Sequence, residues 1–237
     1  MSSSNYLLIS DLQIPFEHEK ALSFCLYLKK YFKIPDENII NVGDEIDEYF
    51  GSLYKKDPNG IHTATSEIHA SIDKLKKWQN AFPKMKLCIS NHGQRWAKKA
   101  SEAEIPSAMM RTYQEVLQIK SSWQYKLEWR INSRHPFRVI HGMGYSGEKG
   151  HINAAIDSGM STCIGHLHSF GGVAHLRKGI SDEYKTAQSI WAMNTGCLID
   201  VASYAFHYGR ESRSKPTLGC GVVINNGTTP IFFPLDL

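Results

Sequence analysis

The chain has 237 residues, of which 42% are hydrophobic and 21% are charged, and its formal net charge is +4. This composition is typical of a globular protein and argues against a disordered, repetitive or collagen-like chain. The mild excess of basic residues is compatible with an anionic substrate but is too small to predict a nucleic-acid binder by itself. We expect a single domain over residues 1–237, because no stretch resembles a linker between two cores.

The sequence also predicts a cellular location. Residues 1–5 are not a basic segment followed by a long apolar core, and no apolar run is long enough to span a membrane, so we expect a cytoplasmic protein without membrane contact. The cysteines are odd in number, widely spaced and without a C-x-x-C pair, which favours reduced core residues. They are Cys25, Cys88, Cys163, Cys197 and Cys220.

The first half of the chain alternates between predicted strands and helices. An apolar run at 5–11 predicts a strand, residues 19–32 have the periodicity of an amphipathic helix, and a second strand begins at Ile39. A second amphipathic helix over 68–82 leads to a third strand at 85–90. This order predicts a sheet covered by helices.

The second half is richer in strands. Residues 94–120 are predicted to be helical with a break at Pro106, and the alternating apolar residues of 122–134 predict one strand with an exposed face. Further strands are predicted at 137–140, 162–164, 190–199, 220–224 and 230–233, with a short helix at 152–156 and a hairpin turn at 225–227. Together these elements predict an α/β fold in which two mixed sheets lie face to face with helices outside.

The stretch 39–47 is the centre of the predicted site, because an apolar run ends at Gly43 and is followed by Asp44 and Asp47. In α/β proteins, functional groups gather just beyond the carboxyl ends of buried strands. Gly43 leaves room for the backbone to turn beside whatever Asp44 binds, which suits a metal ion or a phosphate. Taken alone, a Gly-Asp pair is equally typical of a simple turn before a helix.

Four other predicted strands also end in polar residues that can bind a metal. They lead to Asp11, to Asn91 and His92, to His141, and to His166 and His168. A single histidine at a strand end is more often a hydrogen-bonded structural residue than a ligand, but the whole set reverses that expectation. Carboxylate, amide and imidazole ligands can hold two divalent ions about 3.5–4 Å apart, and such a pair activates water to hydroxide for attack on phosphorus.

These motifs resemble those of the calcineurin-like metallophosphoesterases. The family pattern is D-x-H, G-D-x-x-D, G-N-H-D/E, a lone H and G-H-x-H, and the matching positions are 11–13, 43–47, 90–93, His141 and 165–168. Each motif is short, but five in the same order run through most of the chain. The resemblance implies a four-layer α/β/β/α sandwich of two mixed sheets and a site for two divalent metal ions.

The resemblance also implies a role for each site residue, with Asp44 bridging the two ions. The ligands of the first ion would be Asp11, Gln13, Asp44 and His168, and those of the second Asp44, Asn91, His141 and His166. His92 would be the general acid beside the leaving group, oriented and kept protonated by Asp47. Arg95 is a further candidate, since a guanidinium suits a substrate phosphate; the alternative is an arginine on a helix surface.

Two departures from the family pattern affect these expectations. Gln13 stands where the family usually has histidine, and an amide oxygen is a harder and weaker ligand than an imidazole nitrogen. We therefore expect a looser first site that favours Mn²⁺ or Mg²⁺ over Zn²⁺, or that stays partly empty until substrate arrives; Fe and Ni are the other ions to consider. Ser90 and Gly93 replace the usual glycine and the usual acid around Asn91 and His92.

Residues outside the motifs are predicted to be structural. The other histidines are expected at the surface or behind the ligands, with His62 and His175 as the nearest candidates for a role. The tryptophans of 94–134 are expected in the core, with a roof over the site that stacks on a base as the alternative. The basic residues of 210–215 are expected to form a solvated loop rather than a phosphate contact.

The expected reaction is hydrolysis of a phosphoester by a metal-bound hydroxide, with phosphodiesterase or nuclease-type activity and nucleic acid among the candidate substrates. One alternative is a phosphomonoesterase that acts on a phosphoprotein or a nucleotide. Another is a catalytically weakened metal-binding protein, because Gln13 replaces the usual histidine. The motifs do not choose between substrates, since specificity comes from loops outside them, and they say nothing of the oligomeric state.

Overall fold

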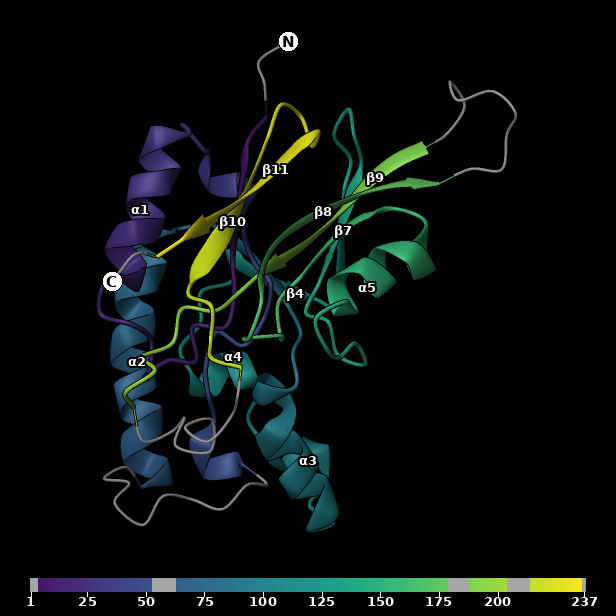
Figure 1. The fold of residues 1–237 in the computed structure, drawn as a ribbon. Helices are drawn as coiled ribbons and strands as arrows, with labels where there is room; N and C mark the ends of the chain where they lie inside the picture. The colour runs from purple at the N-terminus through teal and green to yellow at the C-terminus, as the bar shows by residue number, and fades with distance from the viewer. Residues whose placement is uncertain (1–3, 53–62, 179–187, 204–213, 236–237) are drawn as a thin grey trace.

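The computed structural model describes residues 4–52, 63–178, 188–203 and 214–235. They form two mixed β-sheets with helices on the outer faces (Figure 1). The first sheet contains six strands: β1 (Tyr6–Ile9), β2 (Ile39–Asn41), β3 (Met85–Cys88), β4 (Trp123–Lys126), β10 (Gly219–Ile224) and β11 (Thr229–Pro234). Their order is β11-β10-β1-β2-β3-β4, in which β1 to β4 are parallel and β10 and β11 are antiparallel.

The second sheet has five strands. They are β5 (Glu128–Ile131), β6 (Phe137–Ile140), β7 (Ser161–Ile164), β8 (Gly171–Lys178) and β9 (Gln188–Thr195). The order is β5-β6-β7-β9-β8, with β6, β7 and β9 parallel and the two edge strands antiparallel. Each sheet therefore combines a block of parallel strands with antiparallel strands.

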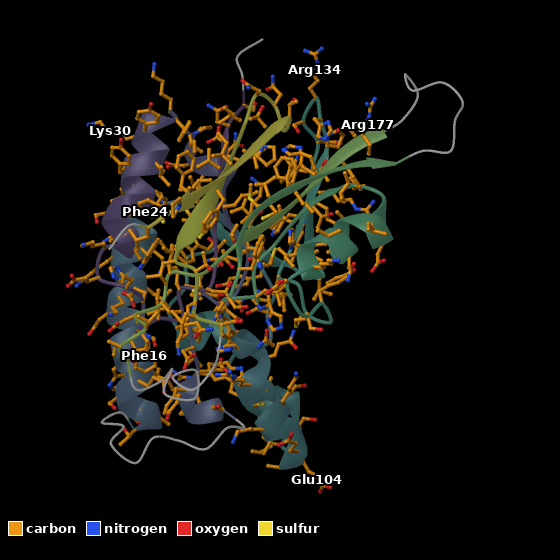
Figure 2. All side chains as sticks on the ribbon, in the orientation of Figure 1. Phe16, Phe24, Lys30, Glu104, Arg134 and Arg177 are labelled. Atoms are coloured by element: carbon orange, nitrogen blue, oxygen red, sulfur yellow. The ribbon has the colours of Figure 1, made fainter. Side chains whose placement is uncertain are left out.

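The helices cover the outer faces of the two sheets. The helices α1 (Ala21–Tyr31) and α2 (Ala64–Ala81) lie beside the six-stranded sheet, and α5 (Gly150–Ser158) packs on β7 and β9 (Figure 1). The helices α3 (Arg95–Glu102) and α4 (Tyr113–Val116) follow β3, and Glu104, just beyond α3, lies far from both sheets (Figure 2). Short 3₁₀ turns complete the set: η1 (Asp36–Asn38), η2 (Tyr49–Gly51), η3 (His92–Gln94) and η4 (Ser107–Met109).

The parallel strands β1, β2 and β7 are buried on both faces. In β1, Leu7 and Ile9 pack in a cluster with Leu75 and Trp78 of α2, whereas Leu8 belongs to a second cluster that includes strands of the other sheet. A third cluster joins α5 to β9. Alternate side chains of one strand thus fill two different cores, which explains why β1 is apolar throughout rather than amphipathic.

Several expectations are confirmed. The described residues form an α/β fold with two mixed sheets, the hairpin turn at 225–227 joins β10 and β11, and all five cysteines are free and buried. Trp123 and Trp129 are core residues, whereas Trp96 is half-buried. No helix within the described ranges is both long and apolar enough to cross a bilayer.

Other expectations need correction. Residues 122–134 were expected to be one strand but form two, β4 and β5, which belong to different sheets. The chain crosses between the sheets at Leu127, which is 64% exposed. The edge strand β8 was not expected at all, and His175 on it is exposed. His62 and most of 210–215 lie outside the described residues.

Candidate metal centre

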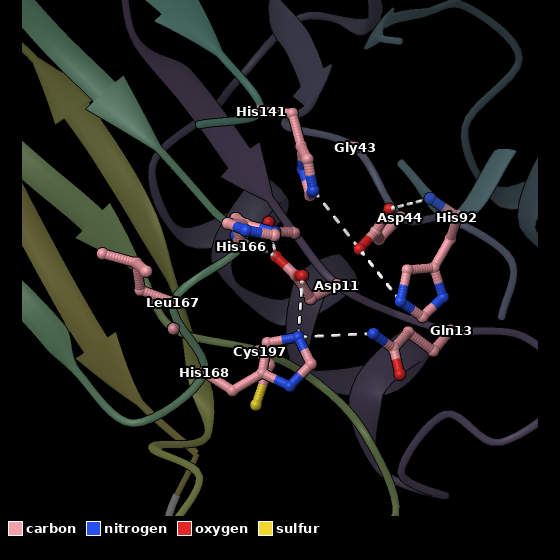
Figure 3. A network of polar contacts seen from close by, with 12 residues as sticks. Asp11, Gln13, Gly43, Asp44, His92, His141, His166, Leu167, His168 and Cys197 are labelled. Atoms are coloured by element: carbon pink, nitrogen blue, oxygen red, sulfur yellow. Dashed lines mark hydrogen bonds and ion pairs between the residues drawn. The ribbon is translucent and has the colours of Figure 1, made fainter. Parts of the chain in front are cut away.

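Five loops place the predicted ligands at one end of the two sheets (Figure 3). Each loop follows one of the strands β1, β2, β3, β6 and β7. Asp11 N donates to Gly43 O at 3.1 Å, which joins the loops after β1 and β2. Gly165 N donates to His141 O at 3.0 Å, which joins the loops after β6 and β7. The backbone therefore fixes the loops of each sheet relative to one another.

Four of the predicted ligands have a left-handed backbone conformation. The angle φ is +48° at Asp11, +47° at Gln13, +52° at Asp44 and +68° at His166. Residues other than glycine rarely adopt this region, at a cost of roughly 1–3 kcal/mol each, so the surrounding fold must impose it. In Figure 3 the side chains of Asp11, Asp44 and His168 point toward one another.

Gly43 shows why this turn needs a glycine. Its φ is +117°, and a Cβ at this position would lie 2.5 Å from Nδ1 of His141 and 2.9 Å from Cβ of Ser90. Both distances are shorter than van der Waals contact. The close approach that the sequence suggested is therefore the approach of the His141 ring to the backbone before Asp44.

The first group of candidate ligands is Asp11, Asp44 and His168, whose ligand atoms all lie within 4.8 Å of one another. Nε2 of His168 lies 2.9 Å from Oδ1 of Asp11 and 3.3 Å from the amide nitrogen of Gln13. The side chains of the two aspartates are almost fully buried, whereas that of His168 is 20% exposed. The group therefore has a buried floor and one side that solvent can reach.

The second group is Asp44, His141 and His166, again within 4.8 Å of one another. Nε2 of His141 lies 3.3 Å from Oδ2 of Asp44 and 2.8 Å from Oδ1 of Asn91. The rings of the two histidines are 5.0 Å apart between centroids. All seven predicted ligands thus lie in one cluster, and Asp44 belongs to both of its groups.

The charged groups of the cluster shift one another's pKa. Burial raises the pKa of Asp44, but His141 and His92 lower it more, so that it lies well below the ordinary value. Burial lowers the pKa of His141, but Asp44 raises it more, to about 9. Burial and His141 lower the pKa of His166. A proton on His141 therefore offsets part of the negative charge of Asp44. A bound metal cation would take over this role.

Two features fit a cation in this cluster. Nδ1 of His141 lies 3.1 Å from the carbonyl oxygen of Val42, and a proton donated there leaves the lone pair of Nε2 for a metal. Oε1 of Gln13 is buried, and none of the described residues donates a hydrogen bond to it. A half-turn of the amide would exchange Oε1 with Nε2 and direct the oxygen at the first group.

His92 lies beside the cluster and belongs to neither group. Its Nδ1 is 2.7 Å from the backbone carbonyl oxygen of Asp47 and 3.2 Å from Oδ1 of the same residue, while its Nε2 is 3.6 Å from Oδ2 of Asp44. Burial lowers the pKa of His92, but the two aspartates raise it more, and the net shift is upward. The structure thus brings His92 and Asp47 together, with the backbone carbonyl as the closer partner.

Arg95 points toward the same place rather than lying on the helix surface. Its side chain is 17% exposed, one terminal nitrogen donates to the carbonyl oxygen of Asp47 at 2.7 Å, and the other lies 2.8 Å from Nε2 of His92. A guanidinium can only donate. In this arrangement Nε2 of His92 therefore accepts, and the imidazole proton is on Nδ1.

Two further residues, which were not expected from the sequence, support the site. Nδ2 of Asn194, at the end of β9, donates to the carbonyl oxygen of Leu167 at 3.0 Å and so holds the loop between His166 and His168. An apolar run followed by a polar residue, the signal that identified the other loops, is present here too. The second residue, Glu48, is buried close to Arg95 and accepts a hydrogen bond from Trp96 N at 3.1 Å. Burial raises the pKa of Glu48 to about 8.

No family model matches the sequence, and no curated protein matches it.

Proposed function

We propose that the protein is a metal-dependent phosphoesterase that uses two divalent ions, with Mn²⁺ as the expected metal and phosphodiesters as the preferred substrates. The observation that carries this proposal is the position of Asp44, which belongs to both groups of ligand atoms. A site of two adjacent ions that stabilises both the attacking and the leaving oxygen is a recurring solution for hydrolysis at phosphorus. The buried carboxylate of Asp44 suits the bridging position between them.

The fold supports the same proposal. Two mixed sheets with helices on their outer faces are compatible with the four-layer α/β/β/α sandwich of the calcineurin-like metallophosphoesterases. The candidate ligands follow the parallel strands of both sheets, as the resemblance in sequence implies.

Each side chain of the site would have its own role in the reaction. When bound, the two ions would polarise the phosphoryl oxygens and lower the pKa of a water molecule. Arg95 would donate to a phosphate oxygen, because its guanidinium already lies at the edge of the cluster. Once Arg95 has moved to the phosphate, Nε2 of His92 would take up a proton from solvent and pass it to the leaving oxygen, while Asp47 holds Nδ1.

A hydrolysis assay tests the proposal. The purified protein is given bis-p-nitrophenyl phosphate or p-nitrophenyl phosphate with Mn²⁺, Mg²⁺, Zn²⁺, Fe²⁺ or Ni²⁺, and with EDTA. We expect turnover of the diester that depends on metal and is lost in Asp44→Asn. His92→Asn should lower kcat by about 10²–10⁴-fold, the usual contribution of a general acid. His69→Asn, an exposed histidine on α2, is the matched control.

The same assay separates two other functions. Faster turnover of the monoester than of the diester would favour a phosphomonoesterase. A metal-binding protein without turnover is the second candidate, because Gln13 is a weaker ligand than histidine. Absence of turnover with every metal, together with metal binding that Asp44→Asn removes, would establish that candidate and overturn the proposal.

A further inference from the structure

A cavity next to the candidate metal centre has no part in the chemistry above. Its volume is about 190 Å³, and its lining includes Glu45, Ile89, Ser90, Gly93, Tyr113 and Tyr125. Pockets for whole ligands usually measure about 300–1,000 Å³. This cavity therefore suits one ring system, that is, part of a ligand rather than all of it.

Several residues that line the cavity are sequence neighbours of candidate site residues. Glu45 follows Asp44 in the chain, and Ser90 and Gly93 flank Asn91 and His92. Ser90 also makes a side-chain hydrogen bond to Asp44. A molecule held by its phosphate at the metal centre would thus have the cavity beside it.

The chemistry of the cavity comes from Glu45, whose side chain is buried beneath two tyrosines. The hydroxyl of Tyr113 donates to Oε1 of Glu45 at 2.7 Å, and that of Tyr125 donates to the same oxygen at 2.9 Å. The two rings meet edge to face, 5.8 Å apart between centroids. Within the described part of the chain, the carboxylate otherwise accepts only from the backbone N–H of Glu45 itself. A carboxylate can accept about four hydrogen bonds, so it keeps a lone pair for a ligand donor.

We propose that this cavity binds the nucleobase of a nucleoside phosphoester and prefers bases with an exocyclic amino group. The proposal rests on the phosphoesterase function proposed above and names its substrate class. A base has flat faces that suit the walls of Ile89 and the tyrosine rings, and its amino group can donate to Oε2 of Glu45. The carboxylate repels a phosphate, which leaves the phosphate to the metal centre.

Glu45 also predicts which bases bind poorly. Uracil and thymine have carbonyl oxygens where cytosine has its amino group, and two acceptors facing each other cannot form a hydrogen bond. Cytidine should therefore bind about tenfold more tightly than uridine, as expected for one hydrogen bond to a charged group. Cytidine and uridine differ mainly at this amino group, so comparing their affinities tests the hydrogen bond to Glu45 directly.

Gly93 offers a way to close the cavity without changing a candidate ligand. A Cβ at this position would lie 3.4 Å from the hydroxyl oxygen and the nearest ring carbon of Tyr113, which is an ordinary contact, and a longer side chain would extend into the cavity. Gly93→Leu should therefore block the cavity, while Gly93→Ala should leave most of it open. Glu45→Gln replaces the acceptor by an amide that can donate to a carbonyl oxygen.

The test measures binding of cytidine and of uridine to the protein in EDTA, by saturation-transfer NMR and by quenching of intrinsic fluorescence. We expect saturable cytidine binding that is about tenfold tighter than uridine binding, is lost in Gly93→Leu and is retained in Gly93→Ala. Glu45→Gln should reduce or invert the preference, which provides a second variant should Gly93→Leu fail to fold. Equal binding of both nucleosides, or no binding at millimolar concentration, would overturn the proposal.

A second measurement separates this proposal from the phosphoesterase function. With Mn²⁺, kcat/KM is compared for the 5′-p-nitrophenyl phosphates of cytidine and uridine, with methyl p-nitrophenyl phosphate as the base-free reference. A preference for the cytidine ester that Gly93→Leu removes supports both proposals. Hydrolysis without base preference overturns the base subsite and leaves the phosphoesterase intact. Selective binding of cytidine without any hydrolysis supports the subsite and counts against the phosphoesterase.

Discussion

A terminal nitrogen of Arg95 lies 2.8 Å from Nε2 of His92, while the other terminal nitrogen is bound to the carbonyl oxygen of Asp47 at 2.7 Å. The arginine is thus fixed at one end and covers the ring nitrogen that a general acid would use. For His92 to protonate a leaving group, Arg95 has to exchange this contact for another. A phosphate oxygen is the natural replacement, since it accepts the donors that the imidazole releases.

Substitution of Arg95 tests this relationship. Arg95→Ala should lower kcat/KM for bis-p-nitrophenyl phosphate by about 10²–10³-fold, as expected when one donor to the developing charge is removed. Arg95→Lys should recover part of the loss, because it restores the charge without the fork of donors. Arg111→Ala, an exposed arginine between α3 and α4, is the control and should retain wild-type activity. An Arg95→Ala enzyme as active as the control would exclude a role in phosphate binding.

The shared position of Asp44 predicts different metal contents for two variants. Asp44→Asn should lose affinity for both ions, whereas His141→Ala should lose only the second, because His141 belongs to one group. The measurement is the number of Mn²⁺ ions per chain after dialysis, by elemental analysis and by isothermal titration calorimetry. Loss of a single ion in Asp44→Asn would show that the carboxylate does not bridge.

Gln13 should control which metal the first position prefers. In Gln13→His an imidazole nitrogen replaces the amide, so the preference should move from Mn²⁺ or Mg²⁺ toward Zn²⁺. Competition dialysis of both proteins against a mixture of Mn²⁺ and Zn²⁺ measures the change. Equal metal content and identity in the two proteins would mean that residue 13 is not a ligand.

Glu48 predicts a dependence of stability on pH. Its pKa is about 8 in the folded protein against an ordinary 4.5, so the folded chain keeps a proton that the unfolded chain releases between these values. The free energy of unfolding should therefore fall as the pH rises from about 4.5 to about 8, by a few kcal/mol at most, and then level off. Below pH 4.5 both states hold the proton and this contribution is constant.

Glu48→Gln keeps an acceptor for Trp96 N and should remove this part of the pH dependence. Urea unfolding at pH 5.5 and pH 8.5 measures the difference, with Glu102→Gln, an exposed residue of α3, as the control. The Glu48→Gln variant should gain stability over wild type at pH 8.5 and little at pH 5.5. The same pH dependence in both proteins would mean that Glu48 is ionised in the folded state.

The sequence predicted the positions of the candidate ligands because each follows an apolar run. Asp11, Asp44 and His141 follow closely after the mainly apolar strands β1, β2 and β6, and this pattern is local. Arg95 was selected for its guanidinium group, and it lies only three residues beyond His92. Residues identified from a few neighbours in the sequence are those that the structure brings together.

The features that the sequence did not predict depend on contacts between distant residues, which leave no local pattern. Leu127 lies between β4 and β5, which belong to different sheets. Apolar and polar residues alternate with a period of two in any strand, so this alternation does not show where the chain passes from one sheet to the other. The strand β8 is a partly exposed edge strand that begins with two glycines, so its apolar signal is weak. The pairing of Glu45 with Tyr113 joins residues 68 positions apart, and nothing near either residue in the sequence predicts it.

The left-handed backbone at Asp11, Gln13, Asp44 and His166 has a consequence for how ions enter and leave. Because packing already imposes this shape, capture of a cation would require no rearrangement of the polypeptide. Association should then be limited by loss of the cation's own hydration shell. Exchange rates should then follow the water-exchange rates of the metals, with Mg²⁺ much slower than Mn²⁺. Glycine at any of these positions would relieve the strain and remove the ligand in one step.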